Sequence, residues 1–322
     1  MSSKSEENKK PIFRIGIISG KGGVGKTTLS ASLALLFNKN NFQILAMDCD
    51  VDAPNLGLLF KSGKIMDNFD VKTLEIAKFN QESCTSCRKC VDEEFCKFGA
   101  LSWDDQSNYP LIDEIACEGC GACEKLCPEH SFHLELITSG TISYEASEYS
   151  FPLIWGETVL GASTSGKLIT EIKKYSETIV KDLDIDLIVI DGPPGIGCPV
   201  IATISDLDFV IVVIEPTQTG LHDADRAIGV LKQLQRKFAI VINKADAWDE
   251  GYNNIVEYAK KAGINIIGKI PVDNSIPNST VKGIPVILFD ENAPASNAIK
   301  DIYKKVLNLI PEQIKNKVKN KK

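Results

Sequence analysis

Short, almost uniformly apolar runs recur along the chain, and between most of them apolar residues return every three or four positions. Runs of this length without polar alternation are typical of strands buried on both faces of a parallel sheet. Strands alternating with helices predict an α/β fold with a doubly wound, mostly parallel sheet. The expected strands are 12–19, 42–48, 186–191, 208–215, 238–243 and 264–271, and the expected helices include 166–181, 219–236, 252–262 and 296–309.

A cysteine-rich segment interrupts this alternation after the second expected strand. Eight of the ten cysteines lie between residues 84 and 127. Residues 81–135 hold twelve Asp or Glu and four Lys or Arg, a balance of −8, whereas the whole chain carries −7. This shift predicts a small acidic α+β module inserted into the sheet domain. The expected division is a disordered start (1–10), a discontinuous nucleotide-binding domain (11–79 and 136–310), the insert (80–135) and a basic tail (311–322).

The first strand leads into a glycine-rich loop, and a helical pattern follows at once. A strand, a loop of this kind and a helix form the context of a phosphate-binding loop, whose backbone N–H groups surround phosphate oxygens. The helix N-terminus adds favourable partial charge. We expect Lys26 to reach the β- and γ-phosphates of ATP or ADP, and Thr27 to bind Mg²⁺. The loop consists of Gly20, Lys21, Gly22, Gly23, Val24, Gly25, Lys26, Thr27 and Thr28.

Acidic residues end two of the other strands. Asp48 and Asp50 follow the second strand, and Asp191 with Gly192 and Pro193 follows the third. Ligands of open α/β sheets bind beyond the carboxyl ends of the strands, so these residues are expected beside the phosphate-binding loop.

Lys21 makes the loop similar to that of one family. The pattern K-G-G-x-G-K-T-T resembles the deviant phosphate loop of the MinD, ParA, Mrp and nitrogenase iron-protein family. The resemblance implies that Lys21 reaches the nucleotide of a partner subunit, so that the ATP-bound form is a homodimer closed across the nucleotide. It also implies that Asp50 orients the attacking water and that Asp48 lies behind the Mg²⁺ ligands. Asp191 would hold Mg²⁺ through water, while Gly192 and Pro193 respond to the γ-phosphate.

Two further segments resemble the adenine contacts of this family. "VINKAD" would place Asn243 on the base edge, and "IPVD" would place Pro271, Val272 and Asp273 beside the ring. The run from Asn243 to Asp246 also resembles a guanine-reading motif. The deviant loop favours ATP, and GTP stays open as an alternative.

The second cysteine run has the full spacing of a bacterial ferredoxin, C-x₂-C-x₂-C-x₃-C-P. In that pattern three cysteines hold one cluster and the fourth crosses to the other. The predicted sets for two [4Fe–4S] clusters are Cys84, Cys87, Cys90 with Cys127, and Cys117, Cys120, Cys123 with Cys96. Gly99, Gly119 and Gly121 suit the tight turns around such clusters.

The first run departs from this pattern. Five residues separate Cys90 from Cys96 where the ferredoxin run has three, and Lys97 stands in place of the proline. Two zinc sites with four cysteines each stay open as an alternative, although zinc sites usually pair two C-x-x-C units without a third cysteine. One intact cluster beside a degraded one is the other alternative.

"DCDVDAPNL", "DGPPGIGCPV" and "EPTQTGLHDADRA" resemble a prokaryotic group of MinD/Mrp-type ATPases that carry an inserted two-cluster ferredoxin domain. The resemblance covers residues 12–310. It implies a Mg²⁺-dependent ATPase that is slow without a partner and acts as a dimeric switch.

Three functions remain open for such a switch. The favoured one is an ATPase that assembles or carries an iron–sulfur cluster or a related metallocofactor. The alternatives are ATP-gated, low-potential electron transfer to a partner and a MinD- or ParA-type positioning ATPase with redox-sensing clusters. Cys198 has the offset from Asp191 of a cluster-ligating cysteine in the nitrogenase iron protein, and could face its copy in a dimer. Packing at a helix start is the simpler interpretation of Cys198.

Charge and cysteine usage limit the partners. We expect a client or redox protein at the acidic insert, since opposite charge accelerates encounter. The net negative charge disfavours nucleic acid. The basic tail offers only Ile314 and Val318 as apolar anchors, too few for stable membrane attachment. Reduced thiols in C-x-x-C spacings without an export signal predict a cytoplasmic protein of anaerobic or microaerobic surroundings.

Overall fold

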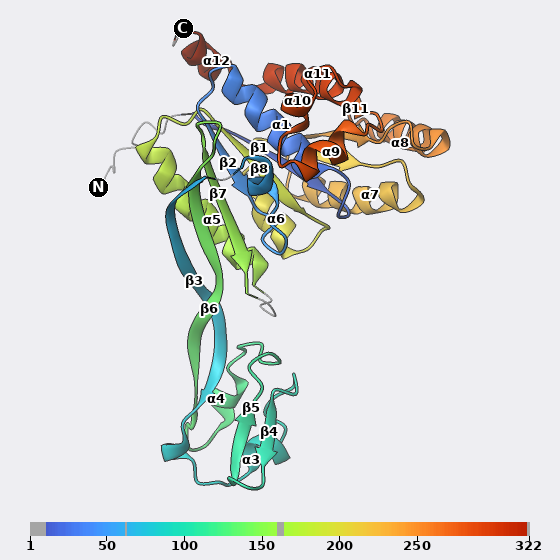
Figure 1. Ribbon diagram of the computed structural model, residues 1–322. Helices are drawn as coiled ribbons and strands as arrows, with labels where there is room; N and C mark the ends of the chain where they lie inside the picture. The colour runs from blue at the N-terminus through green and yellow to red at the C-terminus, as the bar shows by residue number, and fades with distance from the viewer. Residues whose placement is uncertain (1–10, 62, 160–163, 321–322) are drawn as a thin grey trace, which may run out of the picture.

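The computed structural model describes residues 11–61, 63–159 and 164–320. Within these residues, nine strands form one sheet in the order β11-β10-β9-β1-β8-β2-β7-β6-β3 (Figure 1). The strands from β11 to β7 in this order pair in parallel, which confirms the predicted mostly parallel, doubly wound sheet. They are β1 (Phe13–Ser19), β2 (Ile44–Asp48), β7 (Pro152–Thr158), β8 (Leu187–Pro194), β9 (Phe209–Ile214), β10 (Phe238–Asn243) and β11 (Ile266–Ile270).

Helices cover both faces of this sheet, and each face has its own apolar core. Successive strand residues alternate between the two cores, so that Val189 belongs to one while Ile188 and Ile190 belong to the other. The first face carries α1 (Lys26–Lys39), α2 (Leu56–Leu59), α9 (Ser275–Val281), α10 (Val286–Phe289) and α11 (Pro294–Leu309). The second carries α5 (Ser165–Asp182), α6 (Cys198–Ile204), α7 (Gln218–Gln233) and α8 (Asp249–Ala262).

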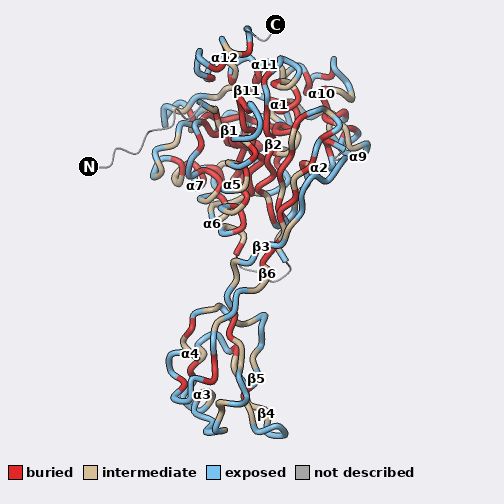
Figure 2. Tube along the Cα trace, turned by 90° about the vertical axis from the view of Figure 1, so that its left-hand side faces the viewer, coloured by how far each residue is buried: buried red, intermediate tan, exposed pale blue. Residues whose placement is uncertain are grey.

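Two long antiparallel strands at the sheet edge form a feature that the apolar pattern did not reveal. β3 (Lys64–Phe79) pairs with β6 (Phe132–Ala146) along its length, and only Gly140–Ala146 of β6 also pairs with β7. The rest of the β3–β6 pair leaves the body as a two-stranded stalk (Figures 1 and 2). Most residues at the start of β3 are exposed or half-buried, so no continuous apolar run marks it.

The cysteine-rich module lies at the far end of the stalk (Figure 1). It consists of α3 (Lys89–Asp92), β4 (Leu101–Asp104), β5 (Tyr109–Ile112) and α4 (Ala122–Leu126). The distal stalk residues Ala77 and Phe132 belong to its small core, and the Phe79 ring contacts those of Tyr109 and Phe132. The expected insert boundaries at residues 80 and 135 fall at this end of the stalk.

The expected basic tail is a packed helix as far as the structure describes it. α12 (Glu312–Lys319) buries Ile314 and Val318 in the same core as α1 and α11, while Lys317 pairs with Asp184 and Asp186. The two apolar residues that a membrane anchor would need are therefore part of the core. None of the helices in the described ranges is long and apolar enough to cross a membrane. Residues 1–10, expected to be disordered, lie outside the described residues.

We predict that Ile314→Ala lowers the free energy of unfolding by about 2 kcal/mol, because it removes a buried side chain and leaves a cavity. The neighbouring exposed change Gln313→Ala should stay within about 0.5 kcal/mol of the parent. Urea unfolding followed by circular dichroism checks this. Equal midpoints for the two variants would show that α12 does not stabilise the body.

Candidate functional site

The glycine-rich loop between β1 and α1 has the backbone shape that phosphate binding requires. Gly23 and Gly25 have φ values of 75° and 92°, a region that favours glycine. A Cβ on Gly25 would lie 2.4 Å from Asn243 Nδ2, so the end of β10 packs directly on the loop. α1 begins at Lys26, whose side chain is largely buried at the carboxyl end of the central strands.

Two buried carboxylates lie next to this loop because their strands are neighbours. Asp48, the last residue of β2, is the register partner of Asp191 on β8. Burial raises the pKa of Asp191, while hydrogen bonds from Thr27 and Ser30 and the charge of Lys26 oppose that rise. The Ser30 Oγ donates to Asp191 Oδ1 at 2.8 Å. Asp191 therefore lies beside the hydroxyl of Thr27.

Asp48 organises the loop that carries Asp50. Its Oδ1 accepts the N–H of Asp50 at 3.0 Å, and its Oδ2 accepts those of Asn55 and Leu56 at 2.9 Å each. Burial and the charge of Asp191 raise the pKa of Asp48, and these three donors oppose the rise. Burial also raises the pKa of Asp50, opposed by the charge of Lys26. Asp50 and Lys26 thus lie close enough to interact at the phosphate end of the site.

Lys21 is bound within its own chain. Its ammonium donates to Thr217 Oγ1 at 3.1 Å and pairs with Glu215 at 3.5 Å. Glu215 is buried at the end of β9 and also pairs with Lys244 at 2.5 Å. Glu215, Thr217, Lys244 and Ser30 were not among the predicted site residues, because no phosphate-loop motif contains them.

The expected base contacts gather at the ends of β10 and β11. Asn243 Nδ2 donates to the carbonyl of Val24 at 2.8 Å, and its Oδ1 has no hydrogen-bond partner among the described residues. Asp246 accepts the Val272 N–H at 2.7 Å. Asp273 accepts backbone N–H groups at the starts of α9 and α11. Pro271 and Val272 directly precede Asp273 in the chain, and Val272 is the residue that Asp246 binds.

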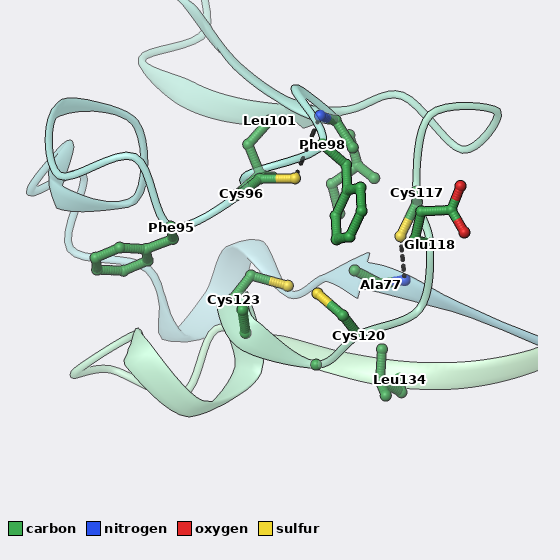
Figure 3. A pocket seen from close by; sticks show the side chains of 14 residues that line it. Ala77, Phe95, Cys96, Phe98, Leu101, Cys117, Glu118, Cys120, Cys123 and Leu134 are labelled. Carbon is green, nitrogen blue, oxygen red and sulfur yellow. Dashed lines mark hydrogen bonds between the residues drawn. The ribbon is translucent and has the colours of Figure 1, made fainter.

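The eight cysteines of the module surround two separate cavities, and the grouping is the one that the ferredoxin pattern predicts. Figure 3 shows the sulfur atoms of the second set turned toward the space between them, near the ring of Phe98. Phe95 lines both cavities. One cavity is lined by Cys84, Cys87, Cys90 and Cys127, and the other by Cys96, Cys117, Cys120 and Cys123.

The two cysteine runs have the same backbone shape despite their different spacing. Ser86 and Arg88 adopt left-handed conformations at the positions of Gly119 and Gly121 in the second run. The remote cysteines agree as well, since Gly99 and His130 are left-handed three residues after Cys96 and Cys127. The two extra residues before Cys96 therefore do not displace it from the position equivalent to Cys127.

Backbone N–H groups are directed at the sulfurs in the same duplicated way. The N–H groups of Ala100 and Ser131 donate to Cys96 Sγ at 3.3 Å and Cys127 Sγ at 3.5 Å, each from four residues further on. Cys84 and Cys117 each accept one more such bond. Both sets thus have two N–H···S contacts, which stabilise negative charge on sulfur.

The thiols of each set interact with one another. Burial, followed by the proximity of Cys127, Cys84 and Cys87, raises the pKa of Cys90 to about 11. Burial also raises the pKa of Cys123, and Cys117 and Cys120 add to it. Four such thiols would ionise together only beside a positive centre that offsets their mutual repulsion. Among the described residues, no three His, Cys, Asp or Glu side chains converge closely enough for a single metal ion.

The second cavity is directly attached to the stalk. Ala77 on β3 donates its N–H to Cys117 Sγ at 3.3 Å, and Leu134 on β6 lines the cavity. A Cβ on Gly119 would lie 2.2 Å from the carbonyl oxygen of Glu75 on β3, so only glycine allows this approach. A change in the pairing of β3 with β6 would therefore reach the ligands of this cavity.

The two remaining cysteines have different surroundings. Cys49 is fully buried after β2, and burial strongly raises its pKa, which identifies it as a packing residue. Cys198 is exposed at the first position of α6, directly after the loop 195–197 that follows β8, the strand of Asp191.

Comparisons with known proteins agree with this geometry. A model of the family described as CobQ/CobB/MinD/ParA nucleotide binding domain matches residues 15–286. An uncharacterized protein of Methanocaldococcus jannaschii is 42% identical over 301 residues, which is 93% of this chain and 98% of that protein. A protein of Pyrococcus furiosus named iron-sulfur cluster carrier protein is 25% identical over 321 residues, with 95% of this chain and 90% of that protein covered.

Solved structures show the same fold. The cell division ATPase MinD of Pyrococcus furiosus aligns with a TM-score of 0.55 at 18% identity, covering 92% of this chain and 99% of that one. A MinC:MinD complex of Aquifex aeolicus gives the same TM-score at 23% identity, with 92% and 96% covered.

Proposed function

The chain belongs to the CobQ/CobB/MinD/ParA family of nucleotide-binding domains, and from this premise we propose that it is an ATPase that assembles or carries iron–sulfur clusters. The observation that carries the proposal is the presence, in one chain, of a phosphate-binding loop with its two carboxylates and two four-cysteine cavities at the end of a stalk. Relatives named iron-sulfur cluster carrier protein support it.

ATP fits the base site better than GTP. Asn243 Nδ2 donates to the Val24 carbonyl, which fixes the orientation of the amide, and its Oδ1 is an acceptor with no partner among the described residues; adenine offers an amino donor to such an acceptor, where guanine offers a carbonyl. The carboxylate of Asp246, which a guanine-reading motif would use, accepts the Val272 N–H instead. The proposed nucleotides are therefore ATP and ADP.

Hydrolysis would need positioning more than covalent chemistry. The backbone from Gly20 to Thr28 cradles the phosphates, Lys26 neutralises their charge, and Asp50 orients the attacking water. Thr27 and, through water, Asp191 would hold Mg²⁺, which neutralises charge on the β- and γ-phosphates. Gly192 and Pro193 would respond to the γ-phosphate. Gly192 packs against Ile17 and Ile18 of β1, so it has little room to shift without β1, the strand that leads into the phosphate-binding loop.

The ATP-bound form is proposed to be a homodimer in which Lys21 contacts the nucleotide of the partner subunit. Lys21 must then leave Glu215. A buried carboxylate without a counter-ion destabilises the protein. Lys244 stays paired with Glu215 at 2.5 Å and removes that cost. The lysine pair thus allows Lys21 to exchange a carboxylate for a phosphate.

We predict opposite effects of two substitutions on dimer formation with a non-hydrolysable ATP analogue. Glu215→Gln releases Lys21 and should tighten association, whereas Lys244→Met leaves Lys21 as the counter-ion and should weaken it, each by about threefold to tenfold. Analytical ultracentrifugation measures both, with the exposed Lys260→Met as control. A GTP analogue should not promote association. Shifts of the same sign in both variants would contradict the exchange.

The module fits two [4Fe–4S] clusters. Each set of sulfurs surrounds a cavity instead of converging on a point, and each receives two backbone N–H groups, as cubane ligands do. A single zinc ion would need four sulfurs converging at about 2.3 Å from it, an arrangement that the described residues do not show. Such clusters supply one-electron storage at low potential.

We predict that Cys96→Ser lowers the iron content of anoxically purified protein from about eight to about four atoms per chain, because one set loses its remote ligand. Cys198→Ser, the same change at an exposed cysteine outside both sets, should keep the eight iron atoms of the two resident clusters, so that any iron it loses is cargo. Colorimetric iron and sulfide assays measure both. Unchanged iron in Cys96→Ser would remove Cys96 from the ligand set.

Cys198 is the proposed site of transferable cargo in the carrier function. Both four-cysteine sets are complete, so a labile cluster needs another thiol, and Cys198 is exposed next to the loop that senses the γ-phosphate. In a symmetric dimer two copies of this thiol could hold one cluster. The acidic module would then serve as the docking surface for the client.

Low-potential electron transfer is the second candidate function. It is favoured because each cavity already has four cysteines. Cross-ligated clusters with four thiolates each are suited to electron transfer and have no open position for exchange.

One experiment separates the two functions. Protein loaded with ⁵⁷Fe is mixed anoxically with an apo-ferredoxin and ATP, and Mössbauer spectra follow the label while EPR follows the resident clusters. The carrier function predicts ATP-dependent transfer that is lost in Cys198→Ser, with resident iron retained. Immobile iron together with an ATP-dependent shift in cluster potential would instead establish electron transfer.

A further inference from the structure

The first turn of α5 contacts three parts of the molecule: the loop that carries Asp50, the start of α6 and the base of the stalk. α5 runs beside the base of the stalk (Figure 1). Its first residue, Ser165, donates its hydroxyl to Asp52 Oδ1 at 2.8 Å. Asp52 lies two residues after the proposed catalytic Asp50, and no phosphate chemistry uses it. The helix start is thereby joined to the loop that a γ-phosphate would move.

Asp52 also reaches the stalk through β7. The hydroxyl of Thr158, the last residue of β7, donates to the same Asp52 oxygen at 2.9 Å, and the Thr158 N–H donates to the carbonyl of Val51 at 2.9 Å. Thr158 is the register partner of Gly140 on β6. One carboxylate oxygen therefore connects the nucleotide loop to both α5 and the point where β6 leaves the sheet.

The stalk is irregular at that point. The pairing of β3 with β6 shifts register between Val71 and Leu74. Ser139 fills the irregularity, since its hydroxyl donates to the Val71 carbonyl at 3.0 Å and also bonds the hydroxyl of Thr73 at 2.6 Å. A bulged two-stranded ribbon bends more easily than a regular one, so this segment is a natural pivot.

α5 holds the pivot from one side. Lys167 Nζ donates to the Thr73 carbonyl at 3.1 Å, in the irregular part of β3. Leu168 is fully buried against Gly140, where an added Cβ would lie 2.6 Å from its Cδ2. Close packing of this kind transmits a displacement instead of absorbing it.

The same turn contacts the second nucleotide loop. A Cβ on Gly166 would lie 3.2 Å from Cβ of Cys198, the first residue of α6, which follows the loop 195–197 at the end of the strand that contains Asp191 (the Asp191 loop). Ser165, Gly166 and Lys167 are thus consecutive residues directed at the Asp50 loop, the Asp191 loop and the stalk.

We propose that this turn is a coupling element: Asp52, Ser165 and Lys167 act as positioning residues that pass nucleotide-driven movement of the two loops to the pivot of the stalk. The inference builds on the proposed nucleotide function and goes beyond it, because it gives the clusters a defined mechanical connection to the nucleotide. At the far end, Ala77 and Glu75 of β3 contact Cys117 and Gly119, so bending of the stalk reaches the ligands of one cavity.

Hydrogen–deuterium exchange on the anoxically purified, iron-loaded protein tests this coupling. Peptides covering 70–76 and 136–142 should change their exchange by at least about threefold when a non-hydrolysable ATP analogue and Mg²⁺ are added. In Lys167→Met and in Asp52→Ala this nucleotide-dependent difference should fall by more than half. Asp52→Asn, which keeps an acceptor oxygen, should retain more of it than Asp52→Ala.

The matched control is Lys181→Met, which changes an exposed lysine in the last turn of α5, at the other end of the helix from Lys167. It should behave as the parent, and Lys167→Met should bind the analogue with parental affinity in calorimetry. A parental exchange difference in both Lys167→Met and Asp52→Ala would overturn the coupling, as would a parent whose stalk does not respond to bound analogue. Failure of the parent to bind the analogue at all would contradict the proposed function instead.

Discussion

The nucleotide site depends on two carboxylates that parallel strands force together. Asp48, the last residue of β2, and Asp191, on the adjacent β8, are register partners, so neither can move away from the other without disrupting the centre of the sheet. Burial makes both charges costly, and the molecule meets that cost with donors from every nearby element: three backbone N–H groups for Asp48 and two hydroxyls for Asp191. The Asp50 loop, the start of α1 and the phosphate-binding loop are all folded around this pair. Because Asp191 has Thr27 and Lys26 as neighbours, the pair lies where the proposed Mg²⁺ and phosphates would bind.

The stalk raises the opposite physical problem. A two-stranded ribbon with both faces largely in water has little apolar burial of its own and is marginally stable in isolation. Here each end is fixed by something else: β7 and Leu168 pack against it at the base, and the aromatic residues of the module at the tip. A connection of this kind can bend between two well-packed ends, whereas a helix or a broad sheet in its place would make the module part of the body.

Much of this organisation could be predicted from the sequence, and the reason differs from part to part. The central strands are buried on both faces, so their apolar runs are unmistakable, and the phosphate-binding loop must use glycine where φ is positive. β3 and β6 left no such trace, because their partly exposed residues carry neither a continuous apolar run nor a strict alternation. Glu215 and Lys244 were missed because their roles arise from tertiary proximity across β9 and β10. The packing of the tail was not predicted for a related reason: two apolar residues in eight are a weak pattern, yet Ile314 and Val318 complete the core beside α1 and α11.

Cys96 shows how a departure from a motif can leave the site unchanged. Spacing matters only through where it puts the sulfur, and two extra residues can be accommodated if the chain returns to the same local conformation. That return is visible in three independent features shared with Cys127: a left-handed residue three positions later, an N–H···S bond from the fourth, and membership of the cavity formed by the other run. The crossed grouping of the cysteines also ties the two halves of the module to each other, because neither cavity is complete with one run alone. If the stalk displaces Cys117 as proposed, both runs would therefore move together, and a nucleotide effect on one of the proposed clusters would reach the other.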